Sequence, residues 1–294
     1  MHIEYNECHL CARNCSVNRN VGQVGYCRST AEPKIRRAAP HLWEEPIISG
    51  ENGSGTIFFS GCSMGCVFCQ NSEISRASVG RTVNESDLSN IMLNLEGQGV
   101  HNINFVTPTH FAPSIIEAVK ISRDRGLNIP IVYNTGSFDS VETIKSLKNT
   151  VDVYLPDYKY VRSETAKRYS QAPTYPSVAF ECIKEMVSQK SVPVIRDGIM
   201  HSGVVIRILL LPGHVAEAKL SLGKLYREFG ERVYYSLMGQ YTPTNGMSAP
   251  LNRRVTASEY REFVDYAVSL GIQNAFVQDL TSASSVYIPD FDLK

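Results

Sequence analysis

The sequence predicts an α/β protein in which parallel strands form a partial barrel of the (β/α)6-type TIM kind, preceded by an irregular cysteine-rich lobe. From about residue 55 onward, short β-branched or aromatic runs alternate with amphipathic helical patterns, and six or seven such units follow one another. Residues 1–54 show neither the periodicity of a helix nor that of a strand. Strand–helix alternation favours a parallel sheet with right-handed crossovers, and active groups of such barrels lie at the carboxyl ends of the strands.

The individual elements follow from local patterns. We expect strands at residues 56–59, 103–106, 129–133, 151–155, 204–211, 233–237 and 275–277. Apolar residues at helical spacing predict helices over about 88–95, 115–119, 179–187 and 260–268. Thr256 and Glu259 have the spacing of a capping box before the last helix, and Gly271 ends it.

Composition excludes several classes of protein. The 294 residues carry 29 basic and 29 acidic side chains, so no net charge attracts nucleic acid or anionic lipid. The longest apolar run, 204–211, is far too short to span a bilayer and contains Arg207. The first seven residues have neither a basic nor an apolar signal region. We expect a cytoplasmic protein with neither a nucleic acid nor a membrane as partner.

The cysteines are the most informative residues. Seven of the eight lie within the first 69 residues, in two tight groups, and Cys182 lies alone at helical spacing among apolar residues. Disulfides would be spread through a small secreted domain, which this chain is not. The pattern therefore favours metal binding by both groups and a core position for Cys182.

The second group, Cys62, Cys66 and Cys69, has the spacing C-x3-C-x2-C directly after the first predicted strand. Three thiolates within eight residues suit one face of an iron–sulfur cube and leave a fourth iron without a protein ligand. An open metal position is a reactive position. A three-cysteine zinc site or plain buried thiols are the alternatives.

This loop resembles that of the radical S-adenosylmethionine (radical SAM) superfamily. Further stretches resemble the branch related to pyruvate formate-lyase activating enzymes, in particular an iron–sulfur subgroup with a cysteine-rich front end: residues 8–19, 102–110, 131–136, 154–160 and 238–241. The resemblance implies an oxidoreductase with a [4Fe–4S] cluster and S-adenosylmethionine. Reductive cleavage of that cofactor gives a 5′-deoxyadenosyl radical, which abstracts hydrogen from the substrate.

Two strand ends are candidates for binding the cofactor. After the second predicted strand, the activating enzymes have a Gly-Gly-Glu stretch, whereas this chain has Thr107 and Thr109 to offer polar groups and His110 to reach the substrate. A plain turn at Pro108 is the alternative. The third predicted strand ends in Asn134, Thr135 and Gly136, which are suited to bind the ribose or the carboxylate of the cofactor. Asn134 stands where the activating enzymes have Asp.

Charged residues mark the next two strand ends. Asp157 and Lys159 match an Asp-x-Lys of the activating enzymes, whose lysine lies near cofactor and substrate; an ordinary exposed ion pair is the alternative. Arg207 interrupts an apolar strand, where an unpaired charge is costly. We expect it to point into the cavity toward a carboxylate, with the cofactor's as the obvious partner.

The front cysteines are Cys8, Cys11, Cys15 and Cys27, spaced C-x2-C-x3-C-x11-C. Four thiolates describe a closed site, which is either a second [4Fe–4S] cluster or structural zinc. Spacing does not decide between these metals, and free or oxidised thiols are the third alternative. A cluster here would relay electrons or anchor the substrate.

The predicted function is hydrogen abstraction from a protein substrate, as in activation of a glycyl-radical enzyme, with an external electron donor of the flavodoxin or ferredoxin type. The alternative is radical modification of a peptide or small molecule. A non-catalytic electron-transfer module is disfavoured because it needs neither a barrel nor an open iron. Sequence identifies neither the substrate nor the oligomeric state.

Overall fold

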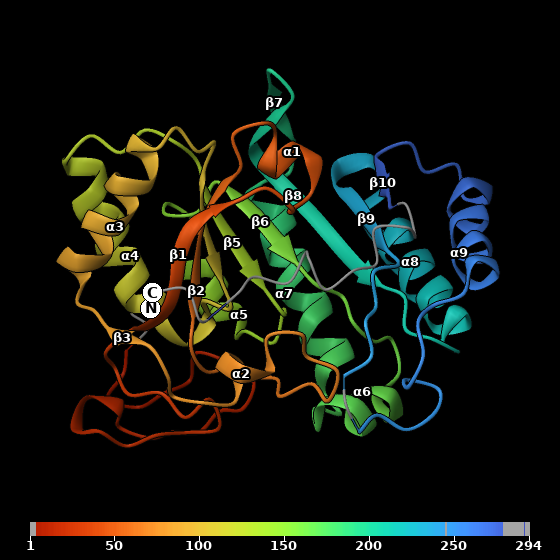
Figure 1. Ribbon diagram of the computed structural model, residues 1–294, viewed down its shortest axis with the longest axis horizontal. Helices are drawn as coiled ribbons and strands as arrows, with labels where there is room; N and C mark the ends of the chain where they lie inside the picture. Colours follow the sequence, from red (N-terminus) through yellow and green to blue (C-terminus); the bar gives the residue numbers. More distant parts are fainter. Residues whose placement is uncertain (1–3, 245, 279–290, 292–294) are drawn as a thin grey trace.

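The computed structural model describes residues 4–244, 246–278 and 291, and its centre is one mixed sheet (Figure 1). The strand order is β10-β9-β8-β6-β5-β4-β2-β1-β3, with β7 paired to β8. The strands are β1 Lys34–His41, β2 Ser54–Phe59, β3 Arg81–Thr82, β4 Ile103–Val106, β5 Ile131–Thr135, β6 Val153–Pro156, β7 Val194–Arg196, β8 Ile199–Leu209, β9 Tyr234–Met238 and β10 Ala275–Val277.

Strands β2, β4, β5, β6, β8, β9 and β10 are all paired in parallel. The sheet does not close, because β10 and β3 lie at its two ends. The predicted partial (β/α)-barrel is therefore confirmed. The carboxyl ends of its strands face the lower side of the view in Figure 1, where α2, α6 and the front residues lie.

Helices connect the strands. The longer ones are α3 Glu85–Gly97, α4 Ala112–Asp124, α6 Ser163–Ser170, α7 Tyr175–Gln189, α8 Val215–Phe229 and α9 Ala257–Ser269; the short ones are α1 Pro46–Ser49, α2 Ser72–Ser75 and α5 Val141–Ser146, with 3-10 turns η1 Arg19–Val21, η2 Thr109–Phe111 and η3 Gly230–Arg232. Thr256 and Glu259 form the predicted capping box of α9. Asn84 and Asp87 form another at α3, which the sequence analysis missed. Reciprocal bonds of this kind satisfy two backbone donors that a helix start leaves unpaired.

The end of the front region differs from expectation. Residues 1–54 were expected to be irregular, yet β1 pairs antiparallel with β2 from Ile35 to His41 and joins the main sheet. Its side chains lack a buried face, since only Ile35 is fully buried. Backbone pairing rather than side-chain burial holds this strand, so no apolar alternation announced it.

The core lies between the sheet and the helices. Buried aromatic and aliphatic side chains of β2, β4, β5, β6, β8 and β9 contact those of α3, α4, α7, α8 and α9. Cys182 of α7 is completely buried in this cluster, as expected of a core thiol. No helix among the described residues is long and apolar enough to cross a bilayer.

Candidate active site

The second cysteine group lies on the loop between β2 and α2, at the carboxyl end of β2. Gly61 has a left-handed backbone (φ 89°), and a Cβ atom there would lie 2.6 Å from the Cys27 carbonyl oxygen. Only glycine fits such a position without displacing its neighbour. The front lobe and the loop are therefore in direct contact.

All three loop cysteines line one cavity of about 240 Å³. Its other walls come from the carboxyl ends of neighbouring strands, as the fold predicts. They include Thr107 and Thr109 after β4, Asn134 of β5 and Gly136 directly after it, Asp157 and Lys159 after β6, Arg207 of β8, and Gln240 and Tyr241 after β9. Most of the residues that the sequence singled out are thus brought together. Thr107 has a φ of 57°, a strained conformation for a β-branched residue and one that is enriched at functional sites.

Each loop sulfur accepts one hydrogen bond. The Met64 amide donates to Cys62 Sγ (3.3 Å), the Ser170 hydroxyl to Cys66 Sγ (3.0 Å) and the Ser75 hydroxyl to Cys69 Sγ (3.5 Å). Donors of this kind stabilise thiolate ligands and tune iron–sulfur centres. The donor set therefore fits a cluster.

The thiols also disfavour negative charge when no metal is present. Burial, with repulsion from Cys66 and Cys69, raises the pKa of Cys62 to about 12. A bound metal replaces the protons of such thiols and compensates their charge. No three His, Cys, Asp or Glu side chains in the described ranges close around a single ion. Ligands of a cluster stand further apart, since iron and sulfide lie between them.

Arg207 forms an ion network at the cavity wall. Its Nε donates to Asp157 Oδ1 (2.8 Å), its Nη1 to Glu44 Oε2 (3.3 Å) and its Nη2 to Asn134 Oδ1 (2.6 Å). Lys159 Nζ donates to Asp157 Oδ2 (2.6 Å). The expectation that Arg207 points into the cavity toward a carboxylate holds, but the carboxylates it contacts are those of this chain, because strand β8 brings it beside them.

Burial alone would raise the pKa of Asp157, but Arg207 and Lys159 together hold it below its ordinary value. Asp157 therefore stays ionised within the wall. The alternative of an exposed surface ion pair does not describe this site, because both side chains are mostly buried (18% and 20% exposed).

Glu44 and Glu45 were missed by the sequence analysis. Both follow β1 in the sequence. Glu44 lies 163 positions before Arg207, with which it is hydrogen-bonded. Burial raises the pKa of Glu44, opposed by Arg207. Burial also raises the pKa of Glu45 to about 7, again opposed by Arg207. Two adjacent acids before Pro46 were the only sequence signal, and adjacent acids are common on surfaces.

Two predicted residues lie outside the cavity wall. The His110 ring is buried and bonds through Nε2 to the Ser60 carbonyl oxygen (2.8 Å), and burial lowers its pKa to about 3. The expected reach of His110 to substrate is therefore not what the geometry shows. The Thr135 hydroxyl donates to Asp139 Oδ2 (2.6 Å), behind the wall. Tyr133 donates to the same carboxylate, which the sequence analysis did not single out.

The front cysteines lie near one another. Burial raises the pKa of Cys11 to about 12, and the neighbouring Cys27, Cys8 and Cys15 thiols add to this. None of the four forms a disulfide. The Tyr26 amide donates to Cys15 Sγ (3.5 Å), and a Cβ at Gly25 would lie 2.7 Å from the same sulfur. Four thiols with a glycine pressed against one of them supply the ligand types of a closed metal site, although no three of them close around a single ion in the described residues.

Arg13 joins the front lobe to the cluster loop. Its guanidinium donates to the carbonyl oxygens of Ser63 and Met64 in the loop and of Ser170 and Gln171 at the end of α6. Five donors in a fixed plane suit this role, which lysine would not fill.

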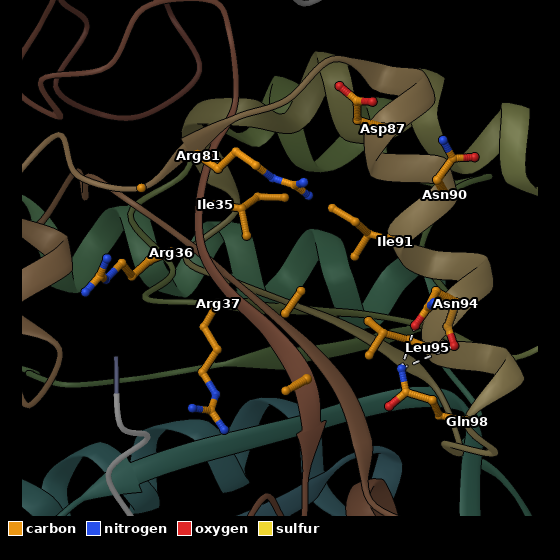
Figure 2. Close-up of a pocket in the computed structure, with 13 residues that line it drawn as sticks. Ile35, Arg36, Arg37, Arg81, Asp87, Asn90, Ile91, Asn94, Leu95 and Gln98 are labelled. Atoms are coloured by element: carbon orange, nitrogen blue, oxygen red, sulfur yellow. Dashed lines mark hydrogen bonds between the residues drawn. The ribbon is translucent and has the colours of Figure 1, made fainter. Parts of the chain in front are cut away.

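A second cavity of about 450 Å³ lies beside the first and shares Gln70, Arg207, Met238 and Gln240 with it. A larger one, of about 930 Å³, lies between β1 and α3. Figure 2 shows Arg81 of β3 extending toward α3, whereas Arg36 of β1 points away from that helix. No cysteine lines that larger cavity, so we do not assign it to the active site.

Comparison with known proteins identifies the family. The model of the radical SAM superfamily matches residues 56–219, which include the cysteine loop and the strand ends up to β8. The chain belongs to the radical SAM superfamily. Membership supports an enzyme and implies a [4Fe–4S] cluster and S-adenosylmethionine.

One relative and two solved structures are also similar to this chain. An uncharacterized protein of Methanocaldococcus jannaschii, MJ0674, is 30% identical over 90% of this chain and 75% of its own length. A radical SAM methyltransferase from Sphaerobacter thermophilus has a TM-score of 0.53 at 16% identity, covering 76% of this chain and 66% of that one. SuiB of Streptococcus suis, bound to S-adenosylmethionine, has a TM-score of 0.51 at 13% identity, over 74% of this chain and 48% of that one. At these identities the two structures show a shared fold, and this chain spans less than two thirds of either.

Proposed function

We propose that this radical SAM protein cleaves S-adenosylmethionine reductively and abstracts hydrogen from a protein substrate, as in activation of a glycyl-radical enzyme. The observation that carries the proposal is the cavity in which Cys62, Cys66 and Cys69 face the strand ends, each sulfur accepting one hydrogen bond. Three ligands and an adjoining cavity suit a cluster with one iron open to a cofactor.

The residues of the first cavity divide the work. The loop cysteines would hold the cluster, and the polar groups of Thr107, Thr109, Asn134 and Gly136 would contact S-adenosylmethionine. When bound, the reduced cluster supplies the electron that cleaves this cofactor. Phe68, which is 6% exposed and packs edge-on against Tyr160, Tyr169 and Tyr241, excludes water from the loop.

The ion network supports both cofactor and substrate. Lys159 and Asp157 line the cavity and are the charged side chains that we propose to lie closest to the cofactor and the substrate. Arg207 orients Asp157 through a hydrogen bond. Thr135 would not contact the cofactor directly, because its hydroxyl is bonded to Asp139. His110 would hold the end of the cysteine loop at Ser60.

The front cysteines would form a second metal centre. A [4Fe–4S] cluster is the preferred occupant, and structural zinc is the alternative. Contact between this lobe and the loop through Arg13 and Gly61 supports electron relay from an external flavodoxin- or ferredoxin-type donor. The division into a metal-binding lobe, residues 1–54, and a barrel, residues 55–294, is part of this proposal. Strand β1 ties the two together.

The test is anaerobic reconstitution with iron and sulfide, followed by reduction in the presence of S-adenosylmethionine. We expect 5′-deoxyadenosine by chromatography, and loss of hydrogen from a candidate protein partner by mass spectrometry. The Cys182→Ala variant is the control, because this thiol is buried in the core away from the cavity. Absence of 5′-deoxyadenosine from fully loaded protein would refute the enzymatic proposal. If hydrogen is abstracted only from small molecules, the proposed protein substrate is wrong and the alternative, radical modification of a small molecule, takes its place.

A further inference from the structure

The second cavity is placed to hold a substrate. It shares four residues with the cavity of the loop cysteines, so a molecule inside it lies next to the proposed cofactor site. Its volume of about 450 Å³ is within the range of ordinary ligand sites. Its remaining walls come from residues 42–50, from Ser236 of β9, and from β10 and the residue after it.

The charges around the two cavities do not balance. Their charged lining residues are the carboxylates Glu44, Glu45 and Asp157 and the cations Lys159 and Arg207. Both cations are committed to Asp157, and Arg207 also contacts Glu44. One carboxylate is therefore left without a cation of its own.

Glu45 is that carboxylate. It is only 6% exposed, and its buried Oε2 atom has no hydrogen-bond partner in the part of the chain that the structure describes. A buried carboxylate oxygen without a hydrogen-bond partner is costly, and native structures rarely keep one without a functional reason. Glu45 lines the second cavity, so a ligand there can supply the missing partner.

We propose that the second cavity binds the substrate by a cationic nitrogen, a protonated amine or a guanidinium, which pairs with Glu45. The identity of this ligand as the substrate rests on the proposed function, whereas its binding does not. The nitrogen belongs either to a basic side chain of a peptide or to a small amine.

The other walls suit the apolar part of such a ligand. Trp43, Met238 and Phe276 line the same cavity and offer apolar and aromatic surface to a methylene stem. A cation near an aromatic face gains further electrostatic attraction. Trp43 is half exposed, at 56%, which places it at the rim rather than in the interior.

The titration of Glu45 agrees with this geometry. Burial raises its pKa to about 7, Arg207 lowers it, and Glu44 raises it, while the Ser236 side chain on β9 lowers it. The side chain is thus poised to lose its proton when a cation arrives. Binding of a cation should accordingly release protons near neutral pH.

Trp43 makes the test direct, because it is the only tryptophan of the chain. The reconstituted protein is titrated with n-butylamine and n-butylguanidinium, and with n-butanol as the neutral counterpart, while tryptophan fluorescence is recorded and calorimetry confirms binding. The peptide acetyl-Gly-Lys-Gly-amide distinguishes a peptide source from a small amine. Tighter binding of the peptide than of n-butylamine assigns the nitrogen to a peptide, and equal or weaker binding assigns it to a small amine.

Glu45→Gln is the decisive variant, and Glu51→Gln is the matched control because Glu51 is exposed and does not line the cavity. We expect Glu45→Gln to bind both cations about ten- to a hundredfold more weakly, as befits loss of a charge-assisted bond, while the control is unchanged. Measured above pH 7, where Glu45 is ionised, its melting temperature should not fall, because a buried charge without an ion pair is removed. A purely structural role would lower it.

Binding of n-butanol as tightly as n-butylamine would overturn the proposal, and so would unchanged cation binding by Glu45→Gln. If that variant fails to fold, the comparison of charged and neutral ligands on the unmodified protein still decides. The assay needs no turnover, so a protein that cleaves S-adenosylmethionine but ignores cations refutes only this inference. One that binds cations but cleaves nothing refutes only the proposed function.

Discussion

The front lobe and the cavity side of the barrel each contain a cysteine group and an arginine that is mostly shielded from solvent, but the two arginines have different partners. Arg19 of the front lobe is 1% exposed and donates to the carbonyl oxygens of Ser29, Thr30 and His110. Arg207 donates to two carboxylates and an amide at the edge of two cavities. The partners of Arg19 are mainly neutral carbonyls that fix the fold, with Cys8 Sγ at 3.9 Å as a further acceptor, whereas two partners of Arg207 are carboxylates beside a cavity.

The thiols show the same contrast. The loop cysteines line a cavity with the strand ends, whereas none of the four front cysteines lines either cavity beside Arg207. Open metal positions permit chemistry and closed ones supply stability or electron transfer. The comparison teaches that similar spacings of cysteine can lie in different surroundings, and that only one of the two groups borders a cavity built from strand ends.

The largest effect is expected at the loop. Replacing Cys62, Cys66 or Cys69 by Ala should abolish formation of 5′-deoxyadenosine, because each change removes a thiolate that solvent does not replace. The measurement is product chromatography under reducing, anaerobic conditions. Full turnover by any of these variants would break the contrast between open and closed groups.

The front group should respond through metal and stability. We expect about eight irons per chain if both groups hold [4Fe–4S] clusters, or about four irons and one zinc if the front site is structural. A Cys8→Ala/Cys11→Ala variant of a structural site should lose melting temperature together with activity, because metal binding contributes to folding. A relay cluster would instead leave the variant folded, slow with a protein donor and normal with a chemical reductant.

Metal analysis of anaerobically purified protein checks this contrast. Finding neither extra iron nor zinc would leave the front cysteines as thiols, and the proposed second centre would be withdrawn.

The ion network should give an intermediate effect. Arg207→Ala leaves Asp157 and Glu44 without their main cation, which typically costs about 3–5 kcal/mol in unfolding free energy. Arg207→Ala and Lys159→Ala should also weaken cofactor binding by about ten- to a hundredfold with the cluster intact. Lys219→Ala, at the exposed pair with Glu262, is the control. Normal binding and cleavage by both cavity variants would remove these residues from the site.

The smallest effect concerns pH. The folded-state pKa of Glu45 is about 7, above its ordinary value of 4.5, because burial opposes its charge more than Arg207 favours it. The folded protein thus keeps a proton that the unfolded chain loses, and the unfolding free energy contributed by this group falls as pH rises from about 4.5 to 7. The loss reaches at most about 3 kcal/mol.

Denaturant unfolding of the unmodified protein and of Glu45→Gln at several pH values measures this loss. The stability advantage of the variant should grow over that pH range, in the absence of amines. A constant difference would show that Glu45 is ionised throughout, with a partner already in place.

Much of the architecture could be predicted from the chain itself. The buried strand of residues 103–106 was located without error, and the capping box at Thr256 and Glu259 formed as its spacing predicts. Local patterns suffice here because burial on both faces and helix capping act over a few residues. Likewise, the C-x3-C-x2-C loop after a strand indicates its own chemistry, since three thiolates lie within eight residues of chain.

Only the tertiary structure decided which charges meet. Glu44 lies 163 positions from Arg207, and no periodicity relates them; they meet because β1 pairs antiparallel with β2 and delivers residues 42–46 to the side of β8. Tertiary packing also buried His110, whose ring bonds to the Ser60 carbonyl oxygen 50 positions away. The sequence determines which residues seek burial or a partner through local and nearly independent preferences. The packing of the sheet determines which charged side chains pair with one another. The free-energy cost of burying a charge depends on low-dielectric surroundings, and these exist only once distant segments have packed.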